Sequence, residues 1–401
     1  MKVTFLAKEY PPNTYGGAGV HLSHLSNYLS RIMEVEVRCF GDQDEKKPHM
    51  KVKGYKSYLP EPDSLSHHRF EPALETFAAN LAMVRDPMDT DVIHTHTWYV
   101  GMAGFLSRMI YYQPLVVTCH SLEPLRPWKE EQLGRGYIVS SWSEKLVLER
   151  ADKIVAVSQT MKQDLLKFFN VKEENIAVIH NGIDLEKWDR LATRGIHEKL
   201  GLKEDYILFV GRTTKQKGLI YLIQAADDLP PDIKIVICTS GADTKQYADE
   251  VAKIAKTKKN IVYIDKMLDP QDYLELYSHC RVFVCPSVYE PFGIINLEAM
   301  ACRRPVVASS VGGIKEVVVQ DETGILIDPA EPRAIAQAVN NLLKNRELAE
   351  EMGQKGRKRV EESFSWAVIA HKTKRLYVDL VGQWWKDEKR HFLSHPDLDQ
   401  Y

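Results

Sequence analysis

Two glutamates at a fixed spacing give the clearest chemical signal in this chain. Glu290 follows the apolar segment 281–285 and precedes a helical segment that contains Glu298. A short, continuously apolar segment is typical of a strand buried in a parallel sheet, so Glu290 is expected in a loop between a strand and a helix N-terminus. Open α/β sheets bind ligands there, and free backbone N–H groups favour an anion. Carboxylates accept hydrogen bonds from hydroxyls, so the pair indicates a ligand with phosphates and vicinal diols, such as a nucleotide sugar.

A basic turn gives the second signal. Arg212 and Lys217 lie in a turn bounded by Gly211 and Gly218, between an expected strand at 206–210 and a helix. Two cations at a strand-to-helix turn suit a diphosphate, because arginine offers a planar fork and lysine a point charge. A solvated basic turn is the alternative interpretation.

A glycine turn follows the first expected strand, residues 1–7. Gly16, Gly17 and Gly19 precede a helix in which leucines recur at helical spacing. This arrangement lets the backbone approach a phosphate closely. The spacing is not G-x-G-x-x-G and no acidic residue clearly ends strand two, which disfavours a dinucleotide-binding oxidoreductase. A tight turn without a ligand is the alternative.

Histidines mark two further strand ends. His120 follows the expected strand 115–119, where it would donate to a sugar hydroxyl or to a developing negative charge. A packed loop histidine is the alternative. His94 and His96 share one face of the expected strand 91–96, but no third ligand has a recognisable spacing, so no metal site is predicted.

The order of elements predicts the fold class. Strands separated by helices of about ten to fifteen residues imply right-handed βαβ units and doubly wound parallel sheets. With 401 residues, two domains are expected. The prediction is an α/β protein with Rossmann-like domains at 1–185 and 204–366 and a charged linker at 186–203. The polar segment 41–68 is expected to be irregular.

Composition excludes several classes. The formal net charge of −2 gives no footprint for nucleic acid. No apolar segment approaches the ~20 residues of a membrane span, and the start of the chain has the pattern of a strand, not of a signal peptide. Six cysteines without a CxxC pair favour reduced thiols in a cytosolic protein. Trp384 and Trp385, ahead of a basic tail, are interpreted as packing on the other domain, with a membrane or partner contact as the alternative.

These motifs together resemble retaining GT-B glycosyltransferases of glycosyltransferase family 4, in particular the glycogen-synthase-like enzymes of the actinobacterial type. The resemblance covers residues 1–385. It rests on Gly16-Gly17-x-Gly19, His120, Asn181-Gly182-Ile183-Asp184, Arg212-x₄-Lys217 and Glu290-x₇-Glu298, and on the segments 9–12, 15–21, 38–42 and 94–99.

The resemblance implies a GT-B fold and a role for each motif. Arg212 and Lys217 would bind the donor diphosphate in place of a metal, and Glu298 would bind the ribose. Glu290 would bind donor-sugar hydroxyls, and His120 would touch the sugar. The further donor-binding residues implied are Gly16, Gly17, Gly19, Asn181 and the backbone N–H groups of Phe292, Gly293 and Ile294.

The resemblance also implies how the reaction and the chain are organised. Family members retain the anomeric configuration, with front-face attack and the leaving phosphate taking the acceptor proton, so neither a nucleophile nor a cofactor is needed. Closure of the two domains across a cleft would exclude water. The C-terminal helix, residues 367–401, is expected to pack back on the first domain.

The function expected from this resemblance is glucosyl transfer from ADP-glucose or UDP-glucose, forming an α-1,4 bond. The acceptor would be an α-glucan chain or glucose 1-phosphate. Cations in the loop after His120, namely Arg126, Lys129 and Arg135, suit a phosphorylated acceptor, whereas Trp98, Tyr99 and Trp128 suit stacking on a glucan. Neither pattern decides between the acceptors.

Other functions remain as alternatives. A family 4 enzyme with another small-molecule or lipid acceptor would be supported by a basic amphipathic face in the N-terminal domain, and no strong one is evident. A non-catalytic sugar-binding protein is disfavoured by the cationic pair and both glutamates. A nucleotide-sugar epimerase fits the motifs less well, and a phosphorylase would need a larger chain and a pyridoxal cofactor. Oligomerisation stays open.

Overall fold

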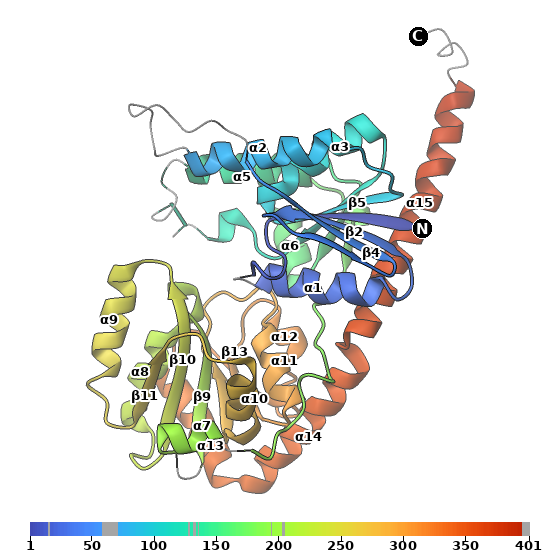
Figure 1. Ribbon diagram of the computed structural model, residues 1–401. Coiled ribbons are helices and arrows are strands. Elements are labelled where there is room, and N and C mark those ends of the chain that lie inside the picture. Colours follow the sequence, from blue (N-terminus) through green and yellow to red (C-terminus); the bar gives the residue numbers. More distant parts are fainter. Residues whose placement is uncertain are drawn as a thin grey trace, which may run out of the picture. The chain divides into compact units, whose positions relative to one another are not determined.

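The chain folds around two predominantly parallel sheets, one in each of two units (Figure 1). The computed structural model describes residues 1–14, 17–57, 71–126, 129–130, 134, 136–193, 195–202 and 205–394. The first unit comprises Met1–His180 and Trp366–Tyr401, and the second comprises Asn181–Ser365.

The first unit contains an eight-stranded sheet in the order β3-β4-β2-β1-β5-β6-β7-β8. All paired strands are parallel except β3 and β4. The order reverses between β1 and β5, and such a switch point is where open α/β sheets bind ligands. The strands are β1 (Lys2–Ala7), β2 (Glu34–Phe40), β3 (Asp44–Lys47), β4 (Met50–Tyr55), β5 (Val92–His96), β6 (Leu115–Cys119), β7 (Lys153–Ala156) and β8 (Ile176–Val178).

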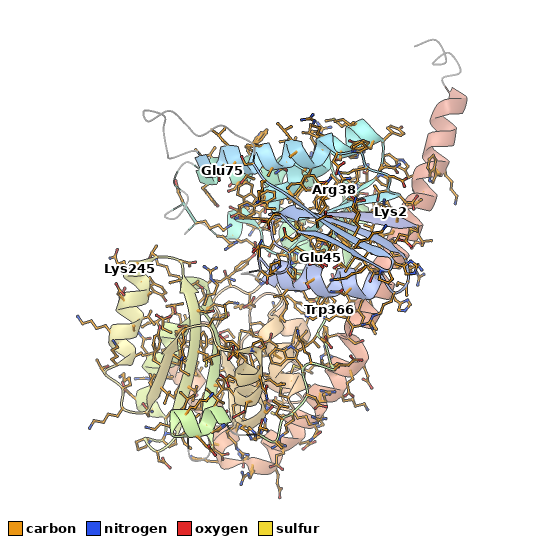
Figure 2. The ribbon with its side chains drawn as sticks, viewed as in Figure 1. Lys2, Arg38, Glu45, Glu75, Lys245 and Trp366 are labelled. Atoms are coloured by element: carbon orange, nitrogen blue, oxygen red, sulfur yellow. The ribbon has the colours of Figure 1, made fainter. Side chains whose placement is uncertain are left out.

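Helices cover both faces of this sheet. On one face α2 contacts α3, and α3 contacts α5. On the other, α1 and α15 share a core with the strands, to which Trp366, Ile369 and Tyr377 of α15 contribute; Figure 2 labels Trp366 beside α1. The long C-terminal helix therefore completes the first unit. The helices are α1 (Gly17–Leu29), α2 (Glu71–Arg85), α3 (Gly101–Tyr111), α5 (Gly136–Leu148), α6 (Gln159–Phe168) and α15 (Trp366–Ser394).

The segment expected to be irregular, 41–68, contains β3 and β4, so that prediction was wrong for residues 44–47 and 50–55. Met50, Val52 and Tyr55 of β4 are buried, while lysines occupy the intervening positions. The lysines and the short length of the segment hid the strand pattern. Residues 58–70 of the same prediction lie outside the described residues.

The second unit contains a six-stranded parallel sheet in the order β11-β10-β9-β12-β13-β14. This is the Rossmann order, with its switch point between β9 and β12. The strands are β9 (Tyr206–Thr213), β10 (Lys234–Ala242), β11 (Ile261–Asp265), β12 (Val282–Cys285), β13 (Val306–Ser309) and β14 (Gly324–Ile327).

The helices of the second unit form two groups. Side chains of α8, α9 and α13 share one apolar core with the strands, whereas α10 contacts α11, and α11 contacts α14. The helices are α7 (Gly195–Leu200), α8 (Leu219–Ala225), α9 (Lys245–Ala255), α10 (Pro270–His279), α11 (Ile294–Ala301), α12 (Ile314–Val317), α13 (Pro332–Lys344) and α14 (Arg346–Ser363).

The segment 186–203, expected as a linker, lies within the second unit. Its helix α7 contacts α10, and the backbone N–H of Ile196 donates to Glu275 at 2.8 Å. Next to it, the N–H of Ile183 donates to the carbonyl of Phe364 at 2.8 Å, so both ends of this unit lie side by side.

Two further findings concern the whole of the described chain. Its six cysteines are all buried and free. None of the helices in the described ranges combines the length and apolar character needed to cross a membrane.

Candidate active site

The turn after β9 presses against the segment that follows β12. Lys217 ends a short 3-10 turn (Lys215–Lys217), and its N–H donates to the hydroxyl of Thr214 at 3.3 Å. Gly218 has a φ of +62°, and a Cβ at this position would lie 2.0 Å from the carbonyl oxygen of Pro286. Only glycine fits there, so this contact fixes where Lys217 stands.

Lys217 and Glu290 form an ion pair at the switch point. Lys217 Nζ donates to Glu290 Oε2 at 2.5 Å, and Ser287 Oγ donates to the same oxygen at 3.3 Å. Glu290 is only 6% exposed. Burial works against the charge of Lys217, but the carboxylate of Glu290 outweighs it and the pKa of Lys217 is raised. The lysine therefore stays protonated in a largely dry site.

A glycine pair holds the backbone of Glu290. The N–H of Gly313 donates to the Glu290 carbonyl at 3.0 Å. Gly312 has a φ of +49°, and a Cβ there would come within 1.9 Å of the same carbonyl oxygen. The loop after β13 therefore contacts the Glu290 backbone and fixes its position, a role that the sequence analysis did not assign.

The N-terminus of α11 lies directly after this glutamate. Gly293 and Ile294 begin the helix, and no side chain caps it. The first N–H groups of a helix have no intrahelical partner, and they favour an anion. Phe292 is buried and packs against Phe364, with ring centroids 5.9 Å apart, which anchors the start of the helix.

Glu298 lies further along α11, close to the buried Tyr277. Burial raises the pKa of Glu298 to about 7, although the Tyr277 hydroxyl and the charge of Lys217 both act to lower it. At neutral pH this carboxyl is therefore close to the midpoint of its titration, and a ligand that donates hydrogen bonds to it would favour the ionised form.

Arg212 is the more accessible of the two predicted cations. Its side chain is 49% exposed, and its guanidinium lies 3.9 Å from Asp243 Oδ1, too far for a hydrogen bond. Its charge acts to lower the pKa of Lys217, so both cations contribute to one positive field. The second unit thus presents two cations, a helix N-terminus and two carboxyl groups at one sheet edge.

The first unit has its own cluster at the corresponding switch point. Lys8 follows β1, and its Nζ lies 3.8 Å from the centroid of the Tyr99 ring. Trp98 stacks on Tyr99, with centroids 4.1 Å apart. Burial lowers the pKa of Lys8, Glu9 opposes this effect, and Lys129 adds to it. Residues after β1, β5 and β6 thus converge at the carboxyl edge of the sheet.

His120 belongs to a cluster of histidines. Its Nε2 lies 3.0 Å from Nδ1 of His96, and the ring of His21 packs edge-on at 4.8 Å. Burial lowers the pKa values of His94, His96 and His120 well below the ordinary value, and the neighbouring histidines add to the effect. His120 is therefore uncharged at neutral pH and can donate one hydrogen bond.

The same cluster contains a third potential metal ligand, which the sequence analysis did not recognise. Ligand nitrogens of His21, His96 and His120 lie within 4.8 Å of one another. His21 comes from α1 and is distant from the other two in sequence, so spacing alone does not reveal it. One nitrogen each of His96 and His120 is already engaged in the hydrogen bond between them.

A pocket in the first unit adjoins His120. Trp98, Tyr99, His120, Arg126 and Lys129 all line it. Within the described part of the chain, Thr97 Oγ1, Trp98 Nε1 and Arg126 Nε are buried without hydrogen-bond partners. Buried polar atoms normally find partners, so this pocket is suited to a polar ligand.

The predicted cations of the pocket differ in their availability. Lys129 Nζ donates to Glu123 Oε1 at 2.7 Å, and this pair is buried. Burial and Arg126 lower the pKa of Lys129, and Glu123 opposes them. Among the described residues, Arg126 donates to the Ser121 hydroxyl at 3.1 Å, while its Nε has no hydrogen-bond partner. Arg126 is therefore the more suitable ligand for an anion.

The comparisons with known proteins agree with this geometry. Residues 15–187 match the family described as Glycosyltransferase Family 4, and residues 194–359 match Glycosyl transferases group 1. An alpha-maltose-1-phosphate synthase of Mycolicibacterium smegmatis is 41% identical over 393 residues, covering 94% of this chain and 99% of the relative. The chain is a family 4 glycosyltransferase.

This hexosyltransferase is also similar to a glycogen synthase and to a sucrose-phosphate synthase. A glycogen synthase of Mycobacterium tuberculosis is 28% identical over 404 residues, covering 94% of each chain. Among solved structures, the sucrose-phosphate synthase of Thermosynechococcus elongatus matches with a TM-score of 0.79 and 25% identity, covering 96% of this chain and 100% of that one. The fold of the family 4 enzyme is therefore GT-B.

The remaining predicted residues occupy different surroundings in the enzyme. Gly17 begins α1 with open space around it, whereas a Cβ at Gly19 would lie 2.9 Å from Glu9, so Gly19 serves the packing of the preceding loop. Asn181 is buried at the first residue of the second unit. Gly16 and Trp128, and also Arg135, lie outside the described residues.

Proposed function

We propose that this enzyme transfers glucose, with retention of configuration, from ADP-glucose or UDP-glucose to the 4-hydroxyl of glucose 1-phosphate, forming maltose 1-phosphate. The observation that carries the transfer is the Lys217–Glu290 pair, 2.5 Å apart at the switch point of a Rossmann sheet and next to an uncapped helix N-terminus. Cation, dipole and carboxylate together suit a sugar diphosphate, which combines negative charge with hydroxyls.

Different groups of the site bind different parts of the donor. Lys217 has three N–H donors and gives one to Glu290, so others are left for the diphosphate, which Arg212 also binds. Phe292, Gly293 and Ile294 lie at the N-terminus of α11, where backbone N–H groups favour an anion. Glu290 accepts from hydroxyls of the transferred sugar, and Glu298 accepts from the ribose diol.

The reaction breaks the bond between the anomeric carbon and the diphosphate oxygen and forms a bond to the acceptor oxygen. The acceptor proton passes to the leaving phosphate, so no enzyme nucleophile is required. Lys217 and Arg212 stabilise the charge that develops on the diphosphate, a role filled elsewhere by a metal ion. His120, being neutral, donates one hydrogen bond to the sugar and does not act as an acid. Gly17 and Asn181 complete the donor contacts in this proposal.

The pocket of the first unit supports a phosphorylated acceptor. Among the described residues, Arg126 has an unpartnered Nε there. Lys8 lies over the ring of Tyr99, which lines the same pocket, whereas the charge of Lys129 is offset by Glu123. The names of two relatives, alpha-maltose-1-phosphate synthase and sucrose-phosphate synthase, each describe a disaccharide product that carries phosphate. An acceptor phosphate bound by Arg126 would account for both observations.

Elongation of an α-glucan is the second candidate. The stacked rings of Trp98 and Tyr99 offer a flat apolar surface of the kind on which sugar rings pack. The relative named glycogen synthase points the same way, at lower identity.

One product assay separates these acceptors. ADP-glucose and UDP-glucose are each incubated with the enzyme and either glucose 1-phosphate or glycogen. The products are separated and identified by mass spectrometry. We expect maltose 1-phosphate with at least one donor. Elongation of glycogen without formation of maltose 1-phosphate would favour α-glucan elongation over the first proposal. The absence of transfer to either acceptor would contradict both proposals.

A further inference from the structure

A second charged pocket lies in the unit that carries the Lys217–Glu290 pair, at the opposite edge of its sheet. Asp205, Arg281 and Arg304 line it, and they precede β9, β12 and β13 respectively. Lys217 and Glu290 instead follow the carboxyl ends of β9 and β12. The two sites therefore lie at opposite ends of the same strands, and one does not overlap the other.

The lining of this pocket is rich in arginine. Among the described residues, five arginines line it together with three carboxylates, Asp205, Glu350 and Glu351, which gives these residues an excess of positive charge in a chain whose formal net charge is −2. None of the described lysines lines it. Guanidinium groups present a planar fork that matches phosphate. The five arginines are Arg190, Arg281, Arg303, Arg304 and Arg346.

Two of these arginines, the buried Arg281 and the partly buried Arg304, lack full hydrogen bonding among the described residues. Arg281 is 6% exposed, and its Nε has no hydrogen-bond partner within the described ranges. The nearest carboxylate oxygen, Asp205 Oδ2, is 3.9 Å away, beyond hydrogen-bond distance. Arg304 Nε is also buried and unpartnered, although the same guanidinium donates to the Ser278 carbonyl. Buried charges are normally paired, so this pocket lacks an acceptor that an anion would supply.

The arginines are held on a constrained backbone. Arg303 has a φ of +57° in the turn between α11 and β13, and it pairs with Asp189. Gly353 of α14 packs on this turn, because a Cβ there would lie 2.2 Å from the Arg303 carbonyl. The helix thereby presents Glu350 to the pocket. Both α11 and α14 belong to this unit (Figure 1).

We infer that this pocket binds a small phosphate-bearing molecule, of the size of a sugar phosphate, at a site separate from the donor site. The pocket volume of about 390 Å³ is in the range of small-ligand pockets. Arg281 and Arg304 bind the phosphate, and the carboxylates of Asp205 and Glu350 accept hydrogen bonds from hydroxyls. The inference stands independently of the acceptor proposed above.

Calorimetry with fructose 6-phosphate, inorganic phosphate and fructose tests this site on the full chain. We expect fructose 6-phosphate to bind, inorganic phosphate to bind more weakly, and fructose not to bind. Arg281→Gln and Arg304→Gln should each weaken binding by about tenfold or more, since a hydrogen bond to a charged group contributes about 1.5–3 kcal/mol. Arg333→Gln, an exposed arginine of α13 outside the pocket, is the matched control and should have no effect.

A second variant and a competition experiment complete this test. If Arg281→Gln does not fold, the exposed Arg346→Gln provides a variant of the same pocket and should weaken binding by about threefold. Saturating ADP or UDP occupies the donor site, so binding that persists in its presence and is lost in the pocket variants locates the phosphate. The inference is wrong if neither phosphate compound binds, or if the pocket variants bind as tightly as Arg333→Gln.

Discussion

The ammonium group of Lys217 lies 2.5 Å from a carboxylate oxygen of Glu290, 73 residues further along the chain. The pair joins the ends of β9 and β12, the two neighbouring strands at which the sheet order reverses. Gly218 and Gly312 make this approach feasible, because side chains at either position would collide with backbone. The backbone of the fold therefore determines where the Lys217–Glu290 pair lies.

Removing either member of this pair should abolish most of the activity. For Lys217→Ala and Glu290→Gln we expect kcat/KM for the nucleotide sugar to fall by about 10²-fold or more, because each variant removes a preorganised charge from the site. Steady-state kinetics measure this loss. Lys215→Ala, an exposed lysine in the same turn, is the matched control and should retain activity. Turnover at the wild-type rate in Lys217→Ala would overturn the site assignment.

Nucleotide binding should depend on the ionisation of Glu298. Burial raises the pKa of this carboxyl to about 7. The ionised form is the stronger hydrogen-bond acceptor for the ribose hydroxyls that we propose it binds. Affinity is therefore full well above pH 7 and is lost as the pH falls through 7, by about tenfold at pH 6. Calorimetric titration with ADP or UDP between pH 6 and 8.5 measures the effect. The slope should become smaller in Glu298→Gln, where the titration of the terminal phosphate of the ligand remains, and an unchanged slope in that variant would assign the dependence to another group.

Much of this site follows from local sequence patterns. Lys217 and Glu290 each follow an apolar segment after a short loop, and such segments become buried strands whose ends meet at one sheet edge. The pattern therefore predicts which residues reach the edge. It also predicts that α15 is long, since the helical periodicity begins at Trp366.

Other features depend on packing between distant segments and have no local signal. The strand β4 is hidden by lysines on its exposed face, and His21 meets His96 and His120 only because α1 crosses the sheet beside them. Likewise, the contact of Gly312 with the Glu290 backbone exists only once β12 and β13 are paired. A pattern within one segment cannot reveal a contact between two.

Arg126 should govern the use of a phosphorylated acceptor. For Arg126→Ala we expect the KM for glucose 1-phosphate to rise by about tenfold or more, because the variant loses a charge-assisted hydrogen bond to phosphate. The KM for the nucleotide sugar should change little. Arg150→Ala, an exposed arginine of the same unit, is the control. A rise in both KM values, or in neither, would remove Arg126 from the acceptor site.

The hydrogen bond between Tyr377 and His94 should stabilise the first unit. The Tyr377 hydroxyl lies 2.6 Å from His94 Nδ1, and His94 Nε2 lies 2.7 Å from the Thr118 hydroxyl, so the imidazole joins α15 to β6. Tyr377→Phe keeps the ring and removes the hydroxyl, which leaves a buried nitrogen unpaired. We expect the free energy of unfolding to fall by about 1–3 kcal/mol.

Thermal and urea unfolding of Tyr377→Phe measure this loss, with Tyr112→Phe as the matched control because Tyr112 is 54% exposed. A loss of 1 kcal/mol corresponds to a fall in Tm of about 2–4 °C for a unit of this size. His94 lies beside His96, which is hydrogen-bonded to His120. We therefore expect Tyr377→Phe to lower kcat slightly as well. Unfolding of Tyr377→Phe that matches the wild type would mean that the Tyr377 hydroxyl contributes neither to the attachment of α15 nor to the histidine cluster.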